Sequence, residues 1–258
     1  MKAFQFVVPV VTLVLVGTAG LARAEDPKPL PREEETPWFS LDSWHGGVEL
    51  GINGSEGNTR SFNGRAGANA MRETDAYVTK VGLTYKLART GSATTENKAA
   101  FDERNDWKLE KGSRWSVFEQ GRLEFDDFQD WDMRLSMFGG VGYRLVDEAK
   151  TKVNLRAGLG VTKKFGGSDT KWSPGAILGA DAFHQLTERQ KLTASIDFFP
   201  SFDPFGRYTA VAKAAWEIVV DPEVKMNLKI GVEDRYDSNP GGKKRNDFDY
   251  FAVLGWAF

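Results

Sequence analysis

The C-terminal end of the chain alternates apolar side chains with other residues at a period of two. Counted back from the end, one face carries Phe258, Trp256, Leu254, Ala252, Tyr250 and Phe248. Because successive side chains of an extended strand point to opposite sides, this spacing predicts a strand with one apolar face. Such an aromatic edge would recruit other chains in a soluble protein. The closing strand of a membrane β-barrel has a paired edge and a lipid-facing aromatic face, so the pattern favours a barrel over an ordinary soluble protein.

The same alternation recurs along the chain. One segment sets Leu192, Ala194, Ile196 and Phe198 against Lys191, Thr193, Ser195 and Asp197. Another sets Val153, Leu155, Ala157, Leu159 and Val161 against Lys152, Asn154, Arg156, Gly158 and Thr162. Helical spacing would have mixed the two sets, so these segments are predicted to be strands.

Turn signals divide the chain after residue 43 into about twelve such strands. The predicted strands are 44–53, 58–71, 75–89, 95–109, 113–126, 130–146, 150–165, 171–186, 190–200, 206–220, 223–237 and 246–258. The predicted fold is all-β: a transmembrane antiparallel up-and-down β-barrel of the bacterial outer-membrane type. An even strand number places both chain ends on the periplasmic side, where turns are short, and gives the outer side the longer loops. Longer loops are expected at 166–170, 200–206 and 237–245.

The fourth, fifth and eighth predicted strands are less regular. Glu103 and Asn105 share a face with Phe101 and Trp107, and Glu119 lies among apolar neighbours. Two interpretations remain open for this region: a β-bulge that shifts the register, or aromatic side chains that face the pore.

The N-terminal part differs in composition. Residues 1–24 are expected to be a secretory signal peptide, with Lys2, an apolar run and a small-x-small site cleaved after Ala24. The apolar run is too short for a membrane-spanning helix. Residues 25–43 are rich in Pro and Glu and are expected to be an exposed periplasmic lead-in, followed by the barrel over 44–258. The chain has no cysteine, which excludes a lipid-modified N-terminus, disulfides and thiolate metal sites.

Charged residues occupy the face of the predicted strands opposite the apolar one. A charge facing hydrocarbon at mid-depth costs about 2–4 kcal/mol, so these side chains are expected to face a lumen. The lumen-facing candidates are Arg65, Lys80, Arg122, Arg134, Arg144, Arg156, Lys213, Lys229, Glu49, Glu124, Asp197, Glu217 and Glu233. The lumen is either a narrow wet channel or a network of ion pairs that fills it, since twelve strands lie between filled barrels and open porins. An excess of basic groups would bias a channel toward anions.

Other chemistry finds little support in the sequence. The two histidines, His45 and His184, fall near the periplasmic rim, and Asp181 falls on the face opposite His184. No serine stands in a nucleophile-elbow setting beside them, so we expect no enzymatic activity. The acidic cluster Asp126, Asp127, Asp130 and Asp132 matches no calcium loop, and neither a metal site nor a cofactor is predicted. A slightly negative net charge and export also argue against nucleic-acid binding.

The first hairpin carries a resemblance to a known family. It contains a Trp-x-Gly start at Trp44, a Glu-x-Gly centre at Glu49 and a Ser-x-Gly-Asn-Thr turn at 55–59. In this it resembles the YdiY-like family of outer-membrane proteins described as salt-induced, whose defining region is domain of unknown function 481. The resemblance runs from Trp44 to Phe258 and implies an outer-membrane barrel. It transfers neither an activity nor functional residues.

The sequence therefore predicts a porin-like barrel in the outer membrane of a Gram-negative-type bacterium. Its expected partners are outer-membrane lipid and lipopolysaccharide, small solutes, and the barrel-assembly machinery. That machinery would read an assembly signal formed by Phe248, Tyr250, Leu254, Trp256 and Phe258. Two roles stay open: a small diffusion channel or stress-related envelope component, and a closed structural or adhesive barrel. An enzyme acting on lipid or peptide is the weakest alternative.

Overall fold

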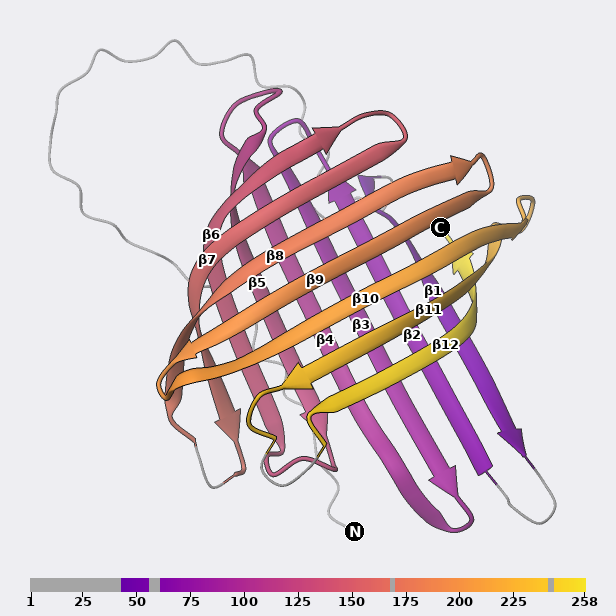
Figure 1. The fold of residues 1–258 in the computed structure, drawn as a ribbon. Coiled ribbons are helices and arrows are strands. Elements are labelled where there is room, and N and C mark those ends of the chain that lie inside the picture. The colour runs from indigo at the N-terminus through magenta and orange to yellow at the C-terminus, as the bar shows by residue number, and fades with distance from the viewer. Residues whose placement is uncertain (1–42, 56–60, 168–169, 241–243) are drawn as a thin grey trace, which may run out of the picture. The chain divides into compact units, whose positions relative to one another are not determined.

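A computed structural model describes residues 43–55, 61–167, 170–240 and 244–258 of the chain. The predicted signal peptide and almost all of the predicted lead-in lie outside the described residues. The described chain forms twelve strands, as the sequence predicts (Figure 1). They are β1 (His45–Ser55), β2 (Ser61–Glu73), β3 (Tyr77–Thr90), β4 (Ala93–Lys108), β5 (Trp115–Asp126), β6 (Met133–Asp147), β7 (Thr151–Phe165), β8 (Trp172–Thr187), β9 (Gln190–Phe202), β10 (Phe205–Asp221), β11 (Met226–Asp237) and β12 (Asn246–Ala257).

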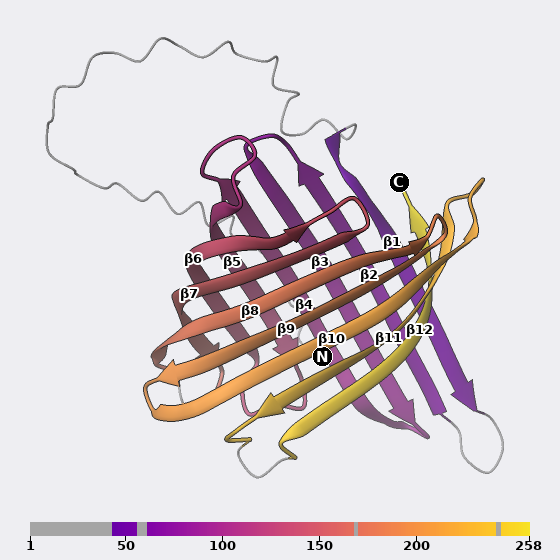
Figure 2. The ribbon, with the colours of Figure 1, turned by 45° about the horizontal axis from the view of Figure 1, so that its top comes forward.

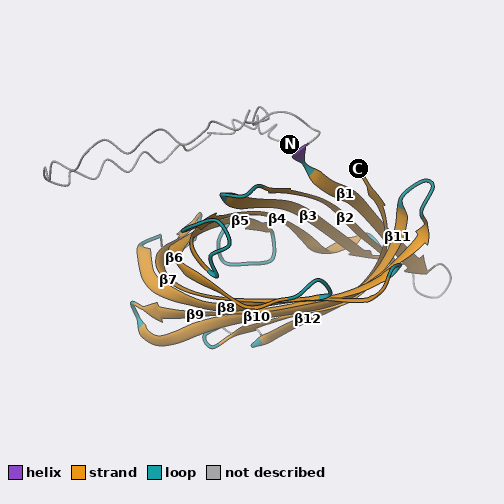
Figure 3. Ribbon diagram, turned by 90° about the horizontal axis from the view of Figure 1, so that it is seen from above, coloured by secondary structure: helices purple, strands orange, loops and turns teal. Residues whose placement is uncertain are grey.

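The strands close into one antiparallel barrel. Each strand pairs with its neighbours in sequence, and β1 pairs with β12, with Gly47 opposite Ala257. The start of β1 and the end of β12 lie at the same end of the barrel, which we call the proximal end. The opposite end is the distal end. The ring of strands is flattened when seen along its axis (Figure 3). No helix in the described ranges is long and apolar enough to cross a membrane.

The apolar set of each strand lies on the outside of the barrel. Leu178 and Ile196 are each 54% exposed, and Leu159 is 65% exposed. The residues of the predicted assembly signal share this outer face, all at least two-fifths exposed: Phe248, Tyr250, Leu254, Trp256 and Phe258. The backbone N–H of Phe258 donates to the Gly46 carbonyl (2.9 Å), which fastens the chain end to β1. A closed ring with an apolar exterior satisfies the requirements for crossing a bilayer with strands.

Neither interpretation of the fourth and fifth strands holds: no bulge shifts their register, and Phe101 and Trp107 do not face the pore. β4 and β5 pair without interruption from Lys98 opposite Asp126 to Lys108 opposite Ser116. The register therefore places Glu103, Asn105 and Glu119 on the outer face with Phe101 and Trp107. The Asn105 amide donates to both Glu103 and Glu119. The two carboxylates therefore stay on the outer face, where each has a hydrogen-bond partner. The register does shift at Ala88/Arg89 between β3 and β4, close to the distal end.

Connections at the two ends agree only partly with expectation. The expected loop at 200–206 is wrong: β9 and β10 extend into it and leave only residues 203 and 204 between them. The segments between β7 and β8 and between β11 and β12 are longer, as expected. Four proximal turns span two to four residues, but the one between β4 and β5 spans six, as many as the segment between β7 and β8. Two proximal turns are joined where Lys111 donates to Asp75 (2.6 Å). That hydrogen bond holds the pKa of Asp75 below its usual value, although both groups lie in water.

Candidate functional site

The inward faces of the strands enclose a water-accessible cavity of about 980 Å³. Its lining begins at the proximal end with Ser113, Arg114 and Lys152 and reaches Pro240 and Lys244 in the distal loop between β11 and β12. The cavity therefore runs along the barrel from one rim to the other. Basic side chains outnumber acidic ones among the residues that line it.

The lumen-facing candidates from the sequence all have inward register positions. Ten of them line the cavity: Glu49, Arg65, Lys80, Arg122, Glu124, Arg134, Arg144, Lys213, Lys229 and Glu233. The other three are held in ion pairs on the same face. Arg156 binds Asp197, and Lys191 Nζ lies 2.8 Å from the Glu217 carboxylate. The strands thus bring the predicted residues together as one ionic interior.

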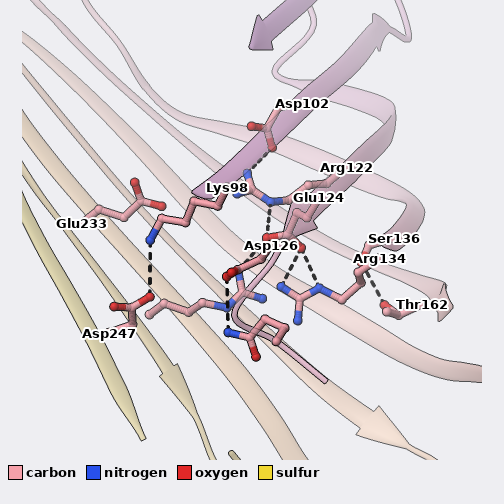
Figure 4. A network of polar contacts seen from close by, with 12 residues as sticks. Lys98, Asp102, Arg122, Glu124, Asp126, Arg134, Ser136, Thr162, Glu233 and Asp247 are labelled. Atoms are coloured by element: carbon pink, nitrogen blue, oxygen red, sulfur yellow. Dashed lines mark hydrogen bonds and ion pairs between the residues drawn. The ribbon is translucent and has the colours of Figure 1, made fainter. Parts of the chain in front are cut away.

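Glu124 on β5 is the centre of an ionic cluster inside the barrel (Figure 4). Its carboxylate is buried and receives guanidinium groups from Arg134 (2.6 Å), Arg235 (2.9 Å) and Arg122 (3.1 Å). Arg235 lies on β11, six strands away from β5 in either direction around the ring. This ion pair therefore joins opposite walls of the barrel. Arg122 also contacts Asp102 at 2.5 Å, which extends the cluster onto β4.

A second cluster crosses the lumen between β4 and β8. Arg104 on β4 reaches Asp181 on β8 (2.8 Å) and its own-strand neighbour Asp106 (2.8 Å). Asp181 also accepts from Arg156 on β7 (2.6 Å), which continues to Asp197 on β9. The Arg156 side chain is only 3% exposed. Buried charges are tolerated when they are paired and hydrogen-bonded in this way, and removing one partner leaves the other uncompensated.

A third set of contacts links β12 with the wall formed by β3 and β4. Lys86 Nζ lies 2.5 Å from the Asp249 carboxylate, and Lys98 Nζ lies 3.4 Å from it. Lys98 also lies 3.6 Å from Asp247 (Figure 4). Together, the three sets of ion pairs brace the lumen at several levels and narrow the space available to a solute.

An apolar group fills one side of the lumen. Phe118 of β5, Phe138 of β6 and Ile177 of β8 are buried together, with Phe199 of β9 packed against them. Glycines on the inward face make room for the rings: a Cβ at Gly158 would lie 3.0 Å from Phe118 Cζ. The lumen residues predicted from the sequence were all charged, so this apolar group was not among them. The alternation of β5 did indicate it: Val117 faces outward, so its neighbour Phe118 must face the lumen.

Arg104 and Asp106 are further lumen residues that the sequence analysis did not select. They occupy the same inward phase as Lys98 and Asp102, so the alternation of β4 contained the signal. Both interpretations of this strand, a bulge and pore-facing aromatic side chains, departed from that alternation. Once the register is continuous, both side chains must face the lumen.

His184 and the acidic residues Asp126 and Asp127 make local hydrogen bonds. His184 Nδ1 lies 2.9 Å from the Thr151 hydroxyl on the outer side of β7 and β8, whereas Asp181 points into the lumen. Asp126 accepts the backbone N–H of Phe128, and Asp127 accepts from Asn97. In the described part of the chain, no three His, Cys, Asp or Glu side chains are grouped to hold a metal ion.

Solved structures with a similar arrangement are outer-membrane barrels. The KdgM porin in complex with disordered oligogalacturonate is 12% identical, with 83% of this chain and 99% of that chain covered and a TM-score of 0.45. The NanC porin is 8% identical, with 83% and 97% covered and a TM-score of 0.44. The translocator domain of the autotransporter NalP from Neisseria meningitidis is 9% identical, with 83% and 87% covered and a TM-score of 0.47. No curated protein matches the chain.

A family model covers the whole barrel. The model of DUF481, described as a protein of unknown function, matches residues 48–258, from the third residue after the start of β1 to the end of the chain. The match includes β1 from Val48 onward, all of β2 to β12 and all the ionic clusters of the lumen. The chain therefore belongs to the DUF481 family.

Proposed function

We propose that the protein is a narrow diffusion channel for small anions in the outer membrane of a Gram-negative-type bacterium. The observation that carries the proposal is the cavity of about 980 Å³, whose lining reaches both rims and contains more basic than acidic side chains. Low-dielectric walls focus the field of such charges, so anions are enriched in the lumen and cations are depleted.

The braces across the lumen set the size limit of the proposed channel. Ion pairs such as Glu124 with Arg235 join opposite walls, and the group around Phe118 fills one side. A solute must pass beside these contacts, through the remaining wet part of the lumen. The proposal therefore covers inorganic anions and small carboxylates rather than long polymers.

The outer-membrane location is supported by the outer surface of the barrel. Its exposed side chains are mainly apolar along the strands, and the C-terminal strand ends in outward aromatic residues. Such a strand is what a barrel-assembly machinery would recognise, and the apolar exterior would contact lipid and lipopolysaccharide. No catalytic role is part of the proposal, since His184 bonds to Thr151 on the outer face, away from Asp181.

Reversing one lumen charge tests the ion selectivity. Lys80 on β3 lines the cavity opposite Arg104 in the ladder. The Lys80→Glu variant replaces a positive by a negative group at the lumen wall, so the ratio of anion to cation permeability should fall toward or below one. The measurement is the reversal potential across a planar bilayer that separates two KCl concentrations.

The matched control is Lys150→Glu, in the exposed proximal turn between β6 and β7. It makes the same change in net charge outside the cavity lining, so it should leave the permeability ratio close to that of the parent protein. Cation selectivity of the parent protein, or equal shifts in both variants, would contradict a lumen-based anion channel.

A closed barrel without conductance is the second candidate. The observation that favours it is the set of ion pairs across the lumen, because each one must be bypassed by a passing ion. The same bilayer recording separates the two candidates. Discrete current steps support the channel, and their absence over a range of salts and voltages supports the closed barrel.

A further inference from the structure

The pairing between the first and last strands stops halfway along the barrel. β1 pairs with β12 over four positions, from Gly47 opposite Ala257 to Leu50 opposite Leu254. On their other sides, β1 pairs with β2 as far as Ser55, and β12 pairs with β11 back to Asn246. The two strands separate toward the distal end (Figures 1 and 2). At Gly51 the strands still touch, since a Cβ there would lie 2.9 Å from the Ala252 carbonyl oxygen. Within the described residues, the edges of 52–55 and 246–251 lie beyond this contact without a ladder between them.

This gap lies within the apolar belt. Outward side chains beside it include Ile52 (65% exposed), Tyr250 (83%) and Phe248 (60%). Open sheet edges are not tolerated against hydrocarbon, but irregular backbone is tolerated where it lines a water-filled cavity. The free edges must therefore be reached by water or polar groups from the lumen. The gap is, on this argument, an opening between the lumen and the lipid.

Two cations stand at the point where pairing ends. In the ladders on either side, Arg65 lies opposite Gly51 and Lys229 lies opposite Val253, the first positions beyond the last β1–β12 pair. Both share one carboxylate: Glu49 is 3.0 Å from Lys229 Nζ and 3.6 Å from Arg65 Nε. Arg65 Nε is buried and makes no hydrogen bond in the described structure. The local charge is thus net positive, and one strong donor is left for an anion.

An aromatic side chain and a second cavity lie beside these cations. The Phe251 ring lies under the Arg65 guanidinium (4.0 Å) and within 6.0 Å of Lys229 Nζ. Phe251 lines the lumen cavity and also a second, mainly apolar cavity of about 840 Å³. Ile52, Tyr250, Ala252 and Trp216 line the second cavity on the outer side. The cationic site, the end of the β1–β12 ladder and the apolar groove therefore lie close together.

We infer that the opening between β1 and β12 admits single-chain anionic amphiphiles, with the acidic head at Arg65 and Lys229 and the alkyl tail in the groove lined by Ile52, Tyr250 and Trp216. The head satisfies the positive charge and the free Arg65 donor, and the tail covers apolar surface that would otherwise meet lipid. This lateral route does not depend on ion passage along the barrel axis.

Photolabelling in vesicles tests the inference. The full chain, refolded in phosphatidylcholine vesicles, is exposed to a C16 fatty acid carrying a diazirine in mid-chain, and labelled residues are mapped by mass spectrometry. Labels are expected on both sides of the gap, at Phe251 as well as at Ile52 and Tyr250. The matching C16 fatty alcohol should label the outer groove alone. Labels confined to outward residues for both probes, or equal labelling by acid and alcohol, would overturn the inference.

A reversible closure of the gap gives the second arm of the test. The chain has no cysteine, so the Ile52→Cys/Ala252→Cys pair can be joined at the second positions beyond the last β1–β12 pair, which are the first ones that face outward. Oxidation should reduce fatty-acid labelling at Phe251 to background, and reduction should restore it in the same sample. The control pair Met137→Cys/Val161→Cys joins β6 and β7, which are paired along their length, and should change nothing.

The charged head has its own variant. Arg65→Gln should lower labelling by the fatty acid to the level of the alcohol, while labelling of the groove by the alcohol stays the same. Labelling that is unaffected by closure of the gap, or disulfide-linked dimers that place a second copy on the free edges, would overturn the inference. Current along the barrel axis is recorded on the oxidised Ile52→Cys/Ala252→Cys variant. This current should persist when the gap is closed. The recording therefore distinguishes a failure of the lateral route from a failure of the channel.

Discussion

The Glu124→Ala variant is expected to lose about 3–5 kcal/mol of unfolding free energy, the usual cost of breaking a buried ion pair by removing one partner. Glu124 is the shared counter-ion of Arg122, Arg134 and Arg235. Without it, three guanidinium groups from two opposite walls face one another across the lumen. Their repulsion should loosen the connection between β5 and β11. The measurement is urea unfolding of the refolded protein in detergent micelles or lipid vesicles.

The control for this change is Glu148→Ala in the proximal turn between β6 and β7, where the residue is exposed. It also removes one carboxylate, but it leaves no buried charge unpaired, and its effect should stay within about 0.5 kcal/mol. If Glu124→Ala is as stable as the control, the ion pairs across the lumen are not formed in the protein. If the loss is large, anion conductance should also rise, because the lumen gains net positive charge.

Arginine on the outer face of β9 is expected to destabilise the folded barrel in lipid by about 2–4 kcal/mol, the cost of a basic group at the bilayer midplane. The variant is Ile196→Arg, at a residue that is 54% exposed on the outside. Its matched partner is Ser195→Arg, one residue earlier, which lines the lumen cavity opposite Asp181. An arginine there meets water and carboxylates, so its effect should be small.

The comparison is made by unfolding both variants in vesicles of the same lipid. The predicted difference depends only on which side of the sheet the new side chain faces, since the two positions are adjacent on one strand. Equal destabilisation of the two variants, or a larger loss for Ser195→Arg, would show that the assigned faces are reversed or that this wall does not meet lipid.

Much of the fold could be predicted because the alternation of each strand reports two environments at once. The set Leu192, Ala194, Ile196 and Phe198 lies outside and the intervening polar set lies inside, as a period of two requires. Turn residues then fixed strand boundaries to within a few positions. The C-terminal pattern also gave the closure of the ring, which the pairing of Leu50 with Leu254 shows directly.

The structural predictions that were wrong failed for physical reasons. Glu103 and Glu119 violate the alternation, so a bulge and pore-facing aromatic side chains were the two interpretations; the structure instead keeps the register and bonds both carboxylates to Asn105. The expected loop at 200–206 was read from Pro and Gly, which are tolerated at strand ends.

Contacts across the lumen could not be predicted from the sequence. The alternation places Glu124 and Arg235 on the inward face of their strands, but it carries no information on which strand lies opposite which. That depends on the flattening of the ring and on the level of each residue along the axis (Figure 3). The end of the β1–β12 ladder was equally hidden, because both strands continue their alternating pattern beyond the last pair.

The most direct test of the account is a scan of solvent access along β9 in lipid vesicles. Because the chain lacks cysteine, each position from 191 to 198 can be given a single spin-labelled cysteine in turn. The account predicts an alternation: labels at 192, 194, 196 and 198 collide with oxygen dissolved in the bilayer, and labels at 191, 193, 195 and 197 collide with a water-soluble nickel complex. Nickel access at every position, or no period of two, would contradict a barrel with a lipid-facing exterior and a wet, charged lumen.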